Sequence, residues 1–374
     1  MEYVNLGDVA TYINGYAFKP EHRGKKGLPI IRIQDLNGNS HDLAFFDGKY
    51  PEQVEINTGD ILISWSGSLG VYKWNKGKAL LNQHIFKVLF NKIEIDKEYF
   101  CYAIRNSLSS MSQQTHGATM KHITKKDFDN ISIPYPDLIE QKKIANNLNI
   151  VNKLIMFYEK ELILFEQMVK ARFIEMFGDL KSNEKDWNLK TFEEMSVLIT
   201  DGEHSTPKRT KEGIYLLSAR NVLNHSLQLK DVDYINRDEY LRIAKRVVPK
   251  KGDILISCSG TIGRCCSVPD SLQLQMVRSV ALIRFKEVIN PIFAEYMITS
   301  DYLQEQINSS KTMSSQANLF QGKIRKLKGF LPPTELQNQF ANFVQQVDKS
   351  REVVKKSLEK TQQLYDSLMQ EYFG

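Results

Sequence analysis

Two serine-rich turns stand where a nucleophile could be presented. They are Ser64-Trp65-Ser66-Gly67 and Ser257-Cys258-Ser259-Gly260, each directly after an apolar run. A serine nucleophile needs a base within hydrogen-bond reach. His84, which lies near the first turn in the sequence, aligns with Ser279 in the second, so a histidine base would exist in only one of them. We therefore interpret both as tight turns after strands, in which Gly67, Gly70, Gly260 and Gly263 provide positive φ.

A second cluster could belong to a metal-dependent nuclease. The segment Pro136-Asp137-Leu138-Ile139-Glu140-Gln141-Lys142 combines two carboxylates with a lysine. The carboxylates are three residues apart, within what would be the first turn of one helix, whereas a nuclease draws its metal ligands from separate elements. Acidic side chains in a first turn interact favourably with the helix dipole. We interpret the segment as the start of a helix.

Other catalytic patterns are missing from the sequence. It has no Gly-x-x-x-x-Gly-Lys-Ser/Thr loop for ATP and no Asn-Pro-Pro-Tyr or Asp-Pro-Pro-Tyr tetrad of adenine methyltransferases. The spacing of Cys101, Cys258, Cys265 and Cys266 predicts core or surface roles rather than a metal site or disulfides. We find no signal peptide and no run of eighteen apolar residues. We expect a cytoplasmic, non-catalytic chain without a metal or cofactor of its own.

The composition is that of an ordinary globular protein. The chain has 374 residues, of which 42% are hydrophobic and 25% charged, and this length predicts two or three domains. The formal net charge is +6. This mildly basic balance is compatible with a polyanionic partner without requiring one.

One unit occurs twice in the sequence. Gly59-Asp60-Ile61-Leu62-Ile63-Ser64 returns 193 residues later as Gly252-Asp253-Ile254-Leu255-Ile256-Ser257. Downstream, 141–145 matches 337–341 at an offset of 196 residues, and this offset holds without a gap to Phe177-Gly178 and Phe373-Gly374. A period of this length indicates a domain duplication rather than a solenoid.

Each copy has two parts. Residues 1–135 and 186–331 mix short β-rich runs with Gly and Asn, which predicts a β-rich domain in each copy. Proline clusters then stop the preceding element and start a helix. Residues 136–185 and 332–374 are accordingly predicted to be a central and a C-terminal long helix.

Both long helices carry an apolar stripe with alternating steps of four and three residues. These steps average 3.5 residues, the period of a coiled coil. Three polar breaks, Arg172, Arg351 and Thr361, would help to fix the register. The stripes are Ile144, Leu148, Val151, Ile155, Tyr158, Leu162, Phe165, Val169, Arg172 and Met176, and then Phe340, Val344, Val347, Arg351, Val354, Leu358, Thr361, Tyr365, Leu368 and Tyr372.

The length of these helices requires a packing partner. A helix from Ile139 to Phe177 would run roughly 58 Å at about 1.5 Å per residue, which exceeds the diameter of its own domain. The second stripe has equal length, so we expect the two helices to pack on each other, antiparallel because the repeat is pseudo-twofold. The alternative is that each helix packs on its own β-rich domain. A paired rod would suit a target of two short pieces at a fixed distance, such as two major-groove sites about one turn apart on DNA.

These features together resemble the specificity subunit of type I restriction–modification systems. Both copies contain Gly-Asp-Ile-Leu-Ile-Ser and a Ser-Gly turn, followed by a Thr- or Gln-rich loop (117–121 and 315–319). Ile-Pro or Leu-Pro-Pro and a helix with Gln in its first turn come next. The resemblance covers essentially the whole chain. The first junction, Pro134-Tyr135-Pro136, departs from the family's usual Pro-Pro-rich pattern.

The resemblance implies an α+β fold with two mixed α/β target recognition domains, separated by two long antiparallel coiled-coil helices in a pseudo-twofold repeat. It implies that each domain reads one half of an interrupted double-stranded DNA site. The helices would set the spacing and bind two modification (methyltransferase) subunits, through which restriction (endonuclease/translocase) subunits join. S-adenosylmethionine, ATP and Mg are then expected on these partners, together with methylation and ATP-dependent cleavage.

Candidate DNA-contacting residues are cationic and amide side chains in loops that differ between the copies. Arg and Lys bind phosphates and favour guanine, whereas Asn and Gln favour adenine. Since the loops diverge, we predict different half-sites for the two domains. The candidates are Lys19, Arg23, Lys25, Lys26, Arg32, Gln34, Lys73, Gln113, Gln114, His116 and Lys121 in the first domain, and Lys208, Arg209, Lys211, Arg220, Asn221, Arg264, Arg278, Gln316 and Asn318 in the second.

Two other functions remain open on the residues alone. One is a coiled-coil adaptor whose domains bind proteins, and the other is an uncharacterised nuclease with an unrecognised site. Sequence-selective, salt-sensitive DNA binding would favour the specificity subunit. Divalent-ion-dependent cleavage by the isolated chain would favour the nuclease.

Overall fold

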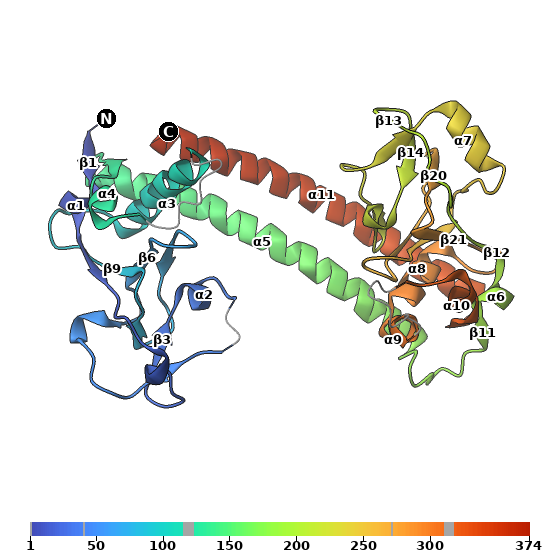
Figure 1. Ribbon diagram of the computed structural model, residues 1–374, viewed down its shortest axis with the longest axis horizontal. Coiled ribbons are helices and arrows are strands. Elements are labelled where there is room, and N and C mark those ends of the chain that lie inside the picture. The colour runs from blue at the N-terminus through green and yellow to red at the C-terminus, as the bar shows by residue number, and fades with distance from the viewer. Residues whose placement is uncertain (1, 40–41, 115–122, 271, 310–317) are drawn as a thin grey trace. The chain divides into compact units, whose positions relative to one another are not determined.

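The computed structural model describes residues 2–39, 42–114, 123–270, 272–309 and 318–374, with the backbone alone at 110–114. The chain forms two compact units. Unit 1 comprises Met1–Glu159 and Lys356–Gly374, and unit 2 comprises Lys160–Lys355. Part of each of two 40-residue helices, α5 (Leu138–Phe177) and α11 (Thr334–Phe373), belongs to each unit (Figure 1).

Unit 1 is built on two four-stranded sheets. The first, fully antiparallel, has the order β2 (Thr11–Asn14), β9 (Ile85–Leu89), β6 (Ile61–Ser64) and β7 (Gly70–Lys73). The second has the order β4 (Phe45–Phe46), β3 (Leu28–Ile31), β8 (Ala79–Leu81) and β5 (Glu55–Ile56), with β3 and β8 parallel. The remaining elements are a ribbon of β1 (Tyr3–Asn5) and β10 (Ser132–Pro134) and the helices α1 (Leu6–Val9), α2 (Ile33–Leu36), α3 (Lys97–Gln114) and α4 (Lys125–Asp129).

Unit 2 repeats the first sheet, whereas its second sheet has the parallel pair at one edge and not in the centre. Its first sheet has the order β12 (Ser196–Asp201), β21 (Val280–Phe285), β18 (Ile254–Ser257) and β19 (Cys265–Ser267). The second has the order β13 (Arg209–Thr210), β17 (Asp233–Ile235), β14 (Ile214–Leu217) and β20 (Leu274–Met276), with β14 and β20 parallel. The remaining elements are the ribbons β11 (Leu189–Thr191) with β22 (Lys328–Phe330) and β15 (Val222–Leu223) with β16 (Ser226–Leu227), and the helices α6 (Phe192–Met195), α7 (Arg237–Ala244), α8 (Pro291–Thr299), α9 (Asp301–Ser309) and α10 (Gln321–Lys326).

The repeated Gly-Asp pair closes the turn before β6 and before β18. The Asp60 carboxylate accepts a hydrogen bond from the Asn57 amide at 2.8 Å and lies 3.3 Å from the ammonium of Lys87 in β9. In unit 2 the Asp253 carboxylate accepts from the Lys250 amide at 2.7 Å and pairs with Arg284 of β21 at 2.6 Å. In both units the carboxylate therefore ties the turn to the neighbouring strand.

The serine turns are structural. The buried hydroxyl of Ser64 donates to the Ser68 carbonyl, and that of Ser257 to the Thr261 carbonyl. The prediction of positive φ is confirmed at Gly67 (69°), Gly260 (67°) and Gly263 (87°). It is wrong at Gly70, which lies within β7. There a Cβ would lie 2.5 Å from the Tyr72 hydroxyl oxygen, so a larger residue at this position would require the Tyr72 side chain to move.

A buried glutamine fastens the start of each long helix. Gln141 donates to the Pro136 carbonyl at 2.8 Å and accepts from the Asp96 amide at 2.9 Å. Gln337 donates to the Pro332 carbonyl at 2.8 Å and accepts from the Asn290 amide at 2.9 Å. These bonds hold the first turns of α5 and α11 against the residues that precede α3 and α8.

The acidic segment before α5 caps the helix. Asp137 Oδ1 accepts a hydrogen bond from the Glu140 amide at 2.9 Å, which satisfies one of the free donors of the first turn. The interpretation of Asp137 and Glu140 as a helix start is therefore confirmed.

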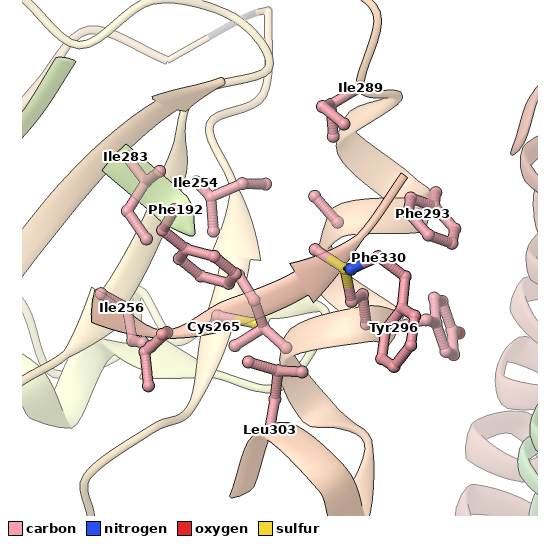
Figure 2. Packing of buried hydrophobic residues seen from close by; sticks show 14 of the residues in the cluster. Phe192, Ile254, Ile256, Cys265, Ile283, Ile289, Phe293, Tyr296, Leu303 and Phe330 are labelled. Carbon is pink, nitrogen blue, oxygen red and sulfur yellow. The ribbon is translucent and has the colours of Figure 1, made fainter. Parts of the chain in front are cut away.

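In unit 2 the last turns of α5 pack on the first turns of α11. The ring of the fully buried Phe340 lies 5.3 Å from that of Phe173 and 5.6 Å from that of Phe177. Val169, Val344 and Val347 belong to the same core cluster, which continues through Tyr296 and Phe293 of α8 to β18 and β21 (Figure 2). One of the expected polar breaks takes part, because the Arg172 guanidinium lies 5.8 Å from the centre of the Phe343 ring.

In unit 1 the first turns of α5 pack near the last turns of α11. Ile144 and Leu148 share a core cluster with Phe373, on which Leu368 and Tyr372 pack. The Asn147 amide donates to the Tyr372 hydroxyl at 3.3 Å. The two helices are thus antiparallel partners within each unit, and the first turns of each helix also pack on the core of its own domain. The predicted α+β class with two long helices is confirmed.

Removal of the Phe340 ring should loosen unit 2 selectively. The ring contacts Phe173, Phe177 and Tyr296, and loss of such a buried aromatic side chain typically costs about 3–5 kcal/mol. We expect Phe340→Ala to lower the unfolding midpoint and to increase hydrogen exchange in β18 and β21. The exposed neighbour Gln339 provides the control Gln339→Ala. Equal protection in the two variants would contradict the assigned packing.

Candidate nucleic-acid interface

In both units a loop leaves the first sheet and is anchored to the second sheet in the same way. We call 15–27 loop A and 202–213 loop B. The Tyr16 amide of loop A donates to the Leu81 carbonyl at 2.8 Å, and its carbonyl accepts from the Gln83 amide at 3.0 Å. The Glu203 amide of loop B donates to the Met276 carbonyl at 2.9 Å, and its carbonyl accepts from the Arg278 amide at 3.0 Å. The loops therefore start from equivalent backbone positions.

Loop A is held by aromatic packing. Phe18 is buried, and its ring lies 4.9 Å from that of Tyr16 and 5.3 Å from that of Phe46. The His22 ring lies 5.1 Å from Phe46. Outside this apolar support the loop exposes four of the predicted DNA-contacting residues, Lys19, Arg23, Lys25 and Lys26. Loop A is thus a cationic surface on an aromatic base.

Loop B is held by charged groups of α7. The Lys208 amide donates to Glu239 Oε1 at 3.0 Å, and the guanidinium of Arg242 donates to both oxygens of this carboxylate at 3.0 Å. Arg242 also lies 3.6 Å from the carboxylate of Glu203. One helical turn further, Arg246 pairs with Asp201 at 2.7 Å and donates to the Gly202 carbonyl at 3.3 Å. We call these contacts the α7 network.

The network favours the ionised forms of Glu203 and Glu239. The hydrogen bond from Arg242 lowers the pKa of Glu239. The hydrogen bond from the Ser205 hydroxyl lowers the pKa of Glu203, and the charge of Arg242 acts in the same direction. Both side chains are largely shielded, with exposed fractions of 9% for Glu239 and 12% for Glu203. Loop B therefore depends on ion pairs that solvent screens only in part.

Loop B also exposes predicted DNA-contacting residues. Lys208, Arg209 and Lys211 all lie at the surface. Arg209, in the short strand β13, pairs through Nε with an Asp233 carboxylate oxygen of β17 at 3.0 Å. Both loops thus expose cationic side chains at equivalent positions in the fold, although aromatic packing supports loop A and ion pairs support loop B.

The turns after β3 and β14 contain further candidates that the structure uses internally. Arg32 is largely buried and pairs with Asp35 at 3.0 Å. Asn221 is fully buried: its side-chain oxygen accepts from the Ser218 amide at 2.9 Å and its nitrogen donates to the carbonyls of Gln228 and Asp231. Asn221 therefore holds its turn together and does not reach the surface, which corrects its selection as a surface contact.

The remaining candidates are scattered over both units. Lys73 is exposed and pairs with Glu98, and Arg220 lies 3.6 Å from Asp231 and 3.4 Å from Asp233. Gln34 and Arg278 are exposed, whereas Arg264 and Asn318 are half-buried. Gln113 and Gln114 end α3, where only the backbone is described, and His116, Lys121 and Gln316 lie outside the described residues.

Sequence reasoning missed the residues of the α7 network. The selection favoured cations in loops, whereas Arg242 and Arg246 lie at the end of a helix and just after it. The sequence did contain a signal for them: Arg242 and Arg246 are four residues apart and Glu239 precedes them by about one turn, a spacing that places all three on one helical face. In the described part of unit 1 the corresponding stretch contains short elements but no helix of comparable length.

The described residues offer little for catalysis or metal binding. Among them, no group of three or more His, Cys, Asp and Glu side chains is arranged to hold a metal ion. All four cysteines are buried free thiols, and burial raises the pKa of Cys101 and of Cys258 to about 12. Within the described ranges, no helix is long and apolar enough to span a membrane.

Comparison with known proteins identifies relatives along the whole chain. The family model for the type I restriction modification DNA specificity domain matches residues 1–164 and again 184–363. The EcoBI specificity subunit of Escherichia coli is 25% identical, over 99% of this chain and 85% of its own. The MjaVIII specificity subunit of Methanocaldococcus jannaschii is 23% identical, over 98% of this chain and 91% of its own.

Solved structures share the fold. The S subunit of a type I restriction–modification system from M. genitalium aligns with a TM-score of 0.61 at 15% identity, covering 100% of this chain and 96% of that one. A chain from a study of complex assembly and conformational transition in the type I R-M system aligns with a TM-score of 0.58 at 14% identity, covering 99% and 97%. The doubled match of the family model corresponds to the duplication in the sequence.

The α7 network predicts the behaviour of loop B when Arg242 is replaced. Arg242→Gln removes the cation shared by Glu203 and Glu239, so we expect at least tenfold faster hydrogen exchange at Ser205 and Lys208. Arg237, exposed on the same helix, supplies the control Arg237→Gln. Unchanged exchange at the Lys208 amide in Arg242→Gln would show that the network does not hold the loop.

Acid should release loop B before loop A. The pKa values of Glu203 and Glu239 are lowered in the fold, so their stabilisation is complete above the ordinary pKa of glutamate and is lost as the pH falls through the lowered values. We expect exchange in loop B, corrected for its intrinsic pH dependence, to accelerate on acidification. The Tyr16 and Phe18 amides of loop A, which donate to the backbone carbonyls of Leu81 and Tyr16, are the internal control, and parallel acceleration at these amides would argue against the mechanism.

Proposed function

The chain belongs to the type I restriction–modification DNA specificity family, and on this premise we propose that it is the subunit that chooses the DNA sites of such a complex. Each of its two sheet-rich parts reads one half of an interrupted DNA target. The proposal rests mainly on one observation: the framework of the two parts is repeated, whereas the loops that it supports differ. A common framework presents both loops in the same way, and unlike loops can read unlike bases.

The proposed contacts divide into two kinds. Exposed lysines and arginines of loops A and B bind phosphates and fix the position of each domain on the duplex. The exposed side chains of Gln34, in α2, and of Arg278, whose amide donates to the Glu203 carbonyl of loop B, are candidates for base edges. We assign the first recognition domain to residues 1–135 and the second to 186–331, and leave the buried Asn221 out of the contact set.

We propose that the long helices set the distance between the half-sites. Their seam is antiparallel within each unit, and a helix of 40 residues is about 60 Å long. If the seam is continuous, the two recognition domains are held a fixed span apart. Half-sites at one or more helical turns of separation then lie on the same face of the DNA.

The partners follow from the family. We propose that the helices bind two modification (methyltransferase) subunits and that restriction subunits join through these. Methylation with S-adenosylmethionine and ATP- and Mg-dependent cleavage would then take place on the partners, and this chain would contribute site selection in the cytoplasm. Support comes from the absence in the sequence of a P-loop and of a methyltransferase tetrad.

The methylated sequence is the most direct test of the proposed function. We expect sequencing that detects methyladenine, applied to DNA modified by the assembled complex, to reveal one bipartite motif. Exchange of residues 186–331 for the domain of a relative should change one half of the motif and leave the other half intact. A change in both halves, or methylation without a bipartite motif, would contradict the assignment of one half to each domain.

The spacing role predicts the effect of longer helices. Seven residues inserted after Glu159 and seven after Lys355, where the chain passes between the units, preserve the heptad register and add about 10 Å. We expect the unread gap in the methylated motif to grow by about three base pairs at about 3.4 Å each, while both half-sites remain the same. An unchanged gap in an active complex would refute the spacing role. Two-residue insertions, which turn the following part of each apolar stripe away from its partner by about 200°, are the control and should abolish activity.

A further inference from the structure

In unit 2 an exposed aromatic residue stands at the N-terminal cap of helix α10. Phe320 directly precedes this helix, and its exposed fraction is 57%. Cap positions favour Ser, Thr, Asp and Asn, because their side chains accept a hydrogen bond from a free amide of the first turn. The side chain of Phe320 forms no such bond. Neither helix capping nor burial in the core therefore accounts for a phenylalanine at this position.

The backbone on both sides of Phe320 is held in place. Leu319 is buried, and its amide donates to the Cys258 carbonyl at 2.9 Å. The Phe320 carbonyl accepts hydrogen bonds from the amides of Lys323 at 2.8 Å and of Ile324 at 3.2 Å, and Ile324 is fully buried. The ring thus projects from a fixed base, so that little backbone freedom is lost when it binds.

Phe320 belongs to the end of the first sheet from which loop B leaves. Strands β12 and β18 end here and β21 begins here, because β21 is antiparallel to both. Backbone hydrogen bonds lead from loop B to the residue before Phe320. They join the Arg278 amide to the Glu203 carbonyl at 3.0 Å, the Cys258 amide to the Ser279 carbonyl at 2.8 Å, and the Leu319 amide to the Cys258 carbonyl. The ring is therefore continuous with the candidate nucleic-acid interface.

Cationic side chains are exposed in the same region. Lys323 and Lys326 lie at the surface of α10, and Arg278 is exposed in the turn between β20 and β21. A nucleic acid fits both features, because its bases offer faces for an aromatic ring and its phosphates pair with cations. An apolar protein surface would leave these cations without counter-charges. Double-stranded DNA, the proposed target of this domain, is the occupant that the chemistry favours.

The first copy of the repeat has the same framework without the aromatic residue. In unit 1 the Ile123 amide donates to the Trp65 carbonyl at 3.2 Å. The next residue, Thr124, caps α4 by accepting a hydrogen bond from the Asp127 amide at 3.2 Å. At the offset of 196 residues, Phe320 stands in the place of Thr124. A residue that breaks a local rule of stability in one copy alone indicates a functional position.

We propose that Phe320 is a wedge that enters between two adjacent base pairs of the half-site read by unit 2, while Lys323 and Lys326 bind the flanking phosphates. This inference rests on the proposed function, because it takes DNA as the ligand of this domain. An apolar wedge kinks the duplex and favours steps that unstack readily, such as the pyrimidine–purine steps TA and CA/TG. Unit 2 then selects part of its half-site by the deformability of one step.

The test compares wild type and variants of the full chain, assembled with the modification subunits of the same system, on duplexes that carry its methylated motif. Phe320→Thr copies the residue of unit 1. It should not lower the unfolding midpoint, because it restores a capping side chain, yet it should weaken binding of the duplex at least tenfold. Phe320→Leu keeps an apolar wedge and should retain most of the affinity.

The control is Val288→Ala, which alters an exposed apolar residue beyond the opposite end of β21. This variant should change neither the unfolding midpoint nor the affinity.

Permanganate oxidation, which detects unstacked thymines, locates the opened step. TA and CA/TG steps both contain a thymine. We expect one thymine in the half-site of unit 2 to react with wild type and to be protected with Phe320→Thr, while reactivity in the other half-site is the same for both proteins. Replacement of that step by a purine–purine step should weaken binding by wild type more than binding by Phe320→Thr.

The outcomes separate this inference from the proposed function. Equal affinity and equal permanganate reactivity of wild type and Phe320→Thr would overturn the wedge, whereas a bipartite methylated motif would still support the proposed function. Failure of Phe320→Thr to assemble with the modification subunits would make a protein the occupant and would also overturn the wedge. If the assembled wild type bound DNA without sequence selectivity, the proposed function itself would be contradicted.

Discussion

The antiparallel seam between α5 and α11 is the interaction on which the rest of the structure depends. Each unit completes its core with turns of both long helices, and unit 1 combines two separate stretches of chain to do so. The core of unit 1 includes Phe373, and Asn106 of α3 donates to the Phe373 carbonyl at 3.0 Å. In unit 2 the rings of Phe173 and Phe177, from the end of α5, lie against Phe340. Burial of these side chains stabilises each domain and the helix pairing at the same time.

On this support the two domains repeat their framework and vary their surface. The side chains that occur in both copies form hydrogen bonds or ion pairs within the framework. They are the carboxylates of Asp60 and Asp253, the hydroxyls of Ser64 and Ser257, and the buried amides of Gln141 and Gln337. Different interactions stabilise the two loops: aromatic rings pack beneath loop A, whereas ion pairs and hydrogen bonds to charged groups hold loop B. A framework that tolerates such change can acquire a new DNA half-site without refolding.

The sequence predicted the architecture better than it predicted the site. Repetition and the 3.5-residue period were enough for the two domains and the paired helices, because both signals extend over many residues. Asn221 and Gly70 were misjudged because residue type and spacing show neither the hydrogen bonds of the Asn221 side chain to its own turn nor the strand conformation of Gly70 in β7. The role of Arg242 was hidden for the same reason, since its carboxylate partners include Glu203, on a loop that precedes α7 by more than thirty residues. The domain boundaries and the DNA contacts themselves remain predictions.

The central claim, that the paired helices hold two reading domains at one fixed separation, is open to a direct measurement. Lys126→Cys on α4 and Lys323→Cys on α10 place exposed labelling sites in the two units, and the four natural cysteines are buried. Single-molecule energy transfer between dyes at these positions reports their separation without DNA or partners. The account predicts one narrow distribution of transfer efficiency. A broad distribution, or several interconverting distances in the folded chain, would contradict it.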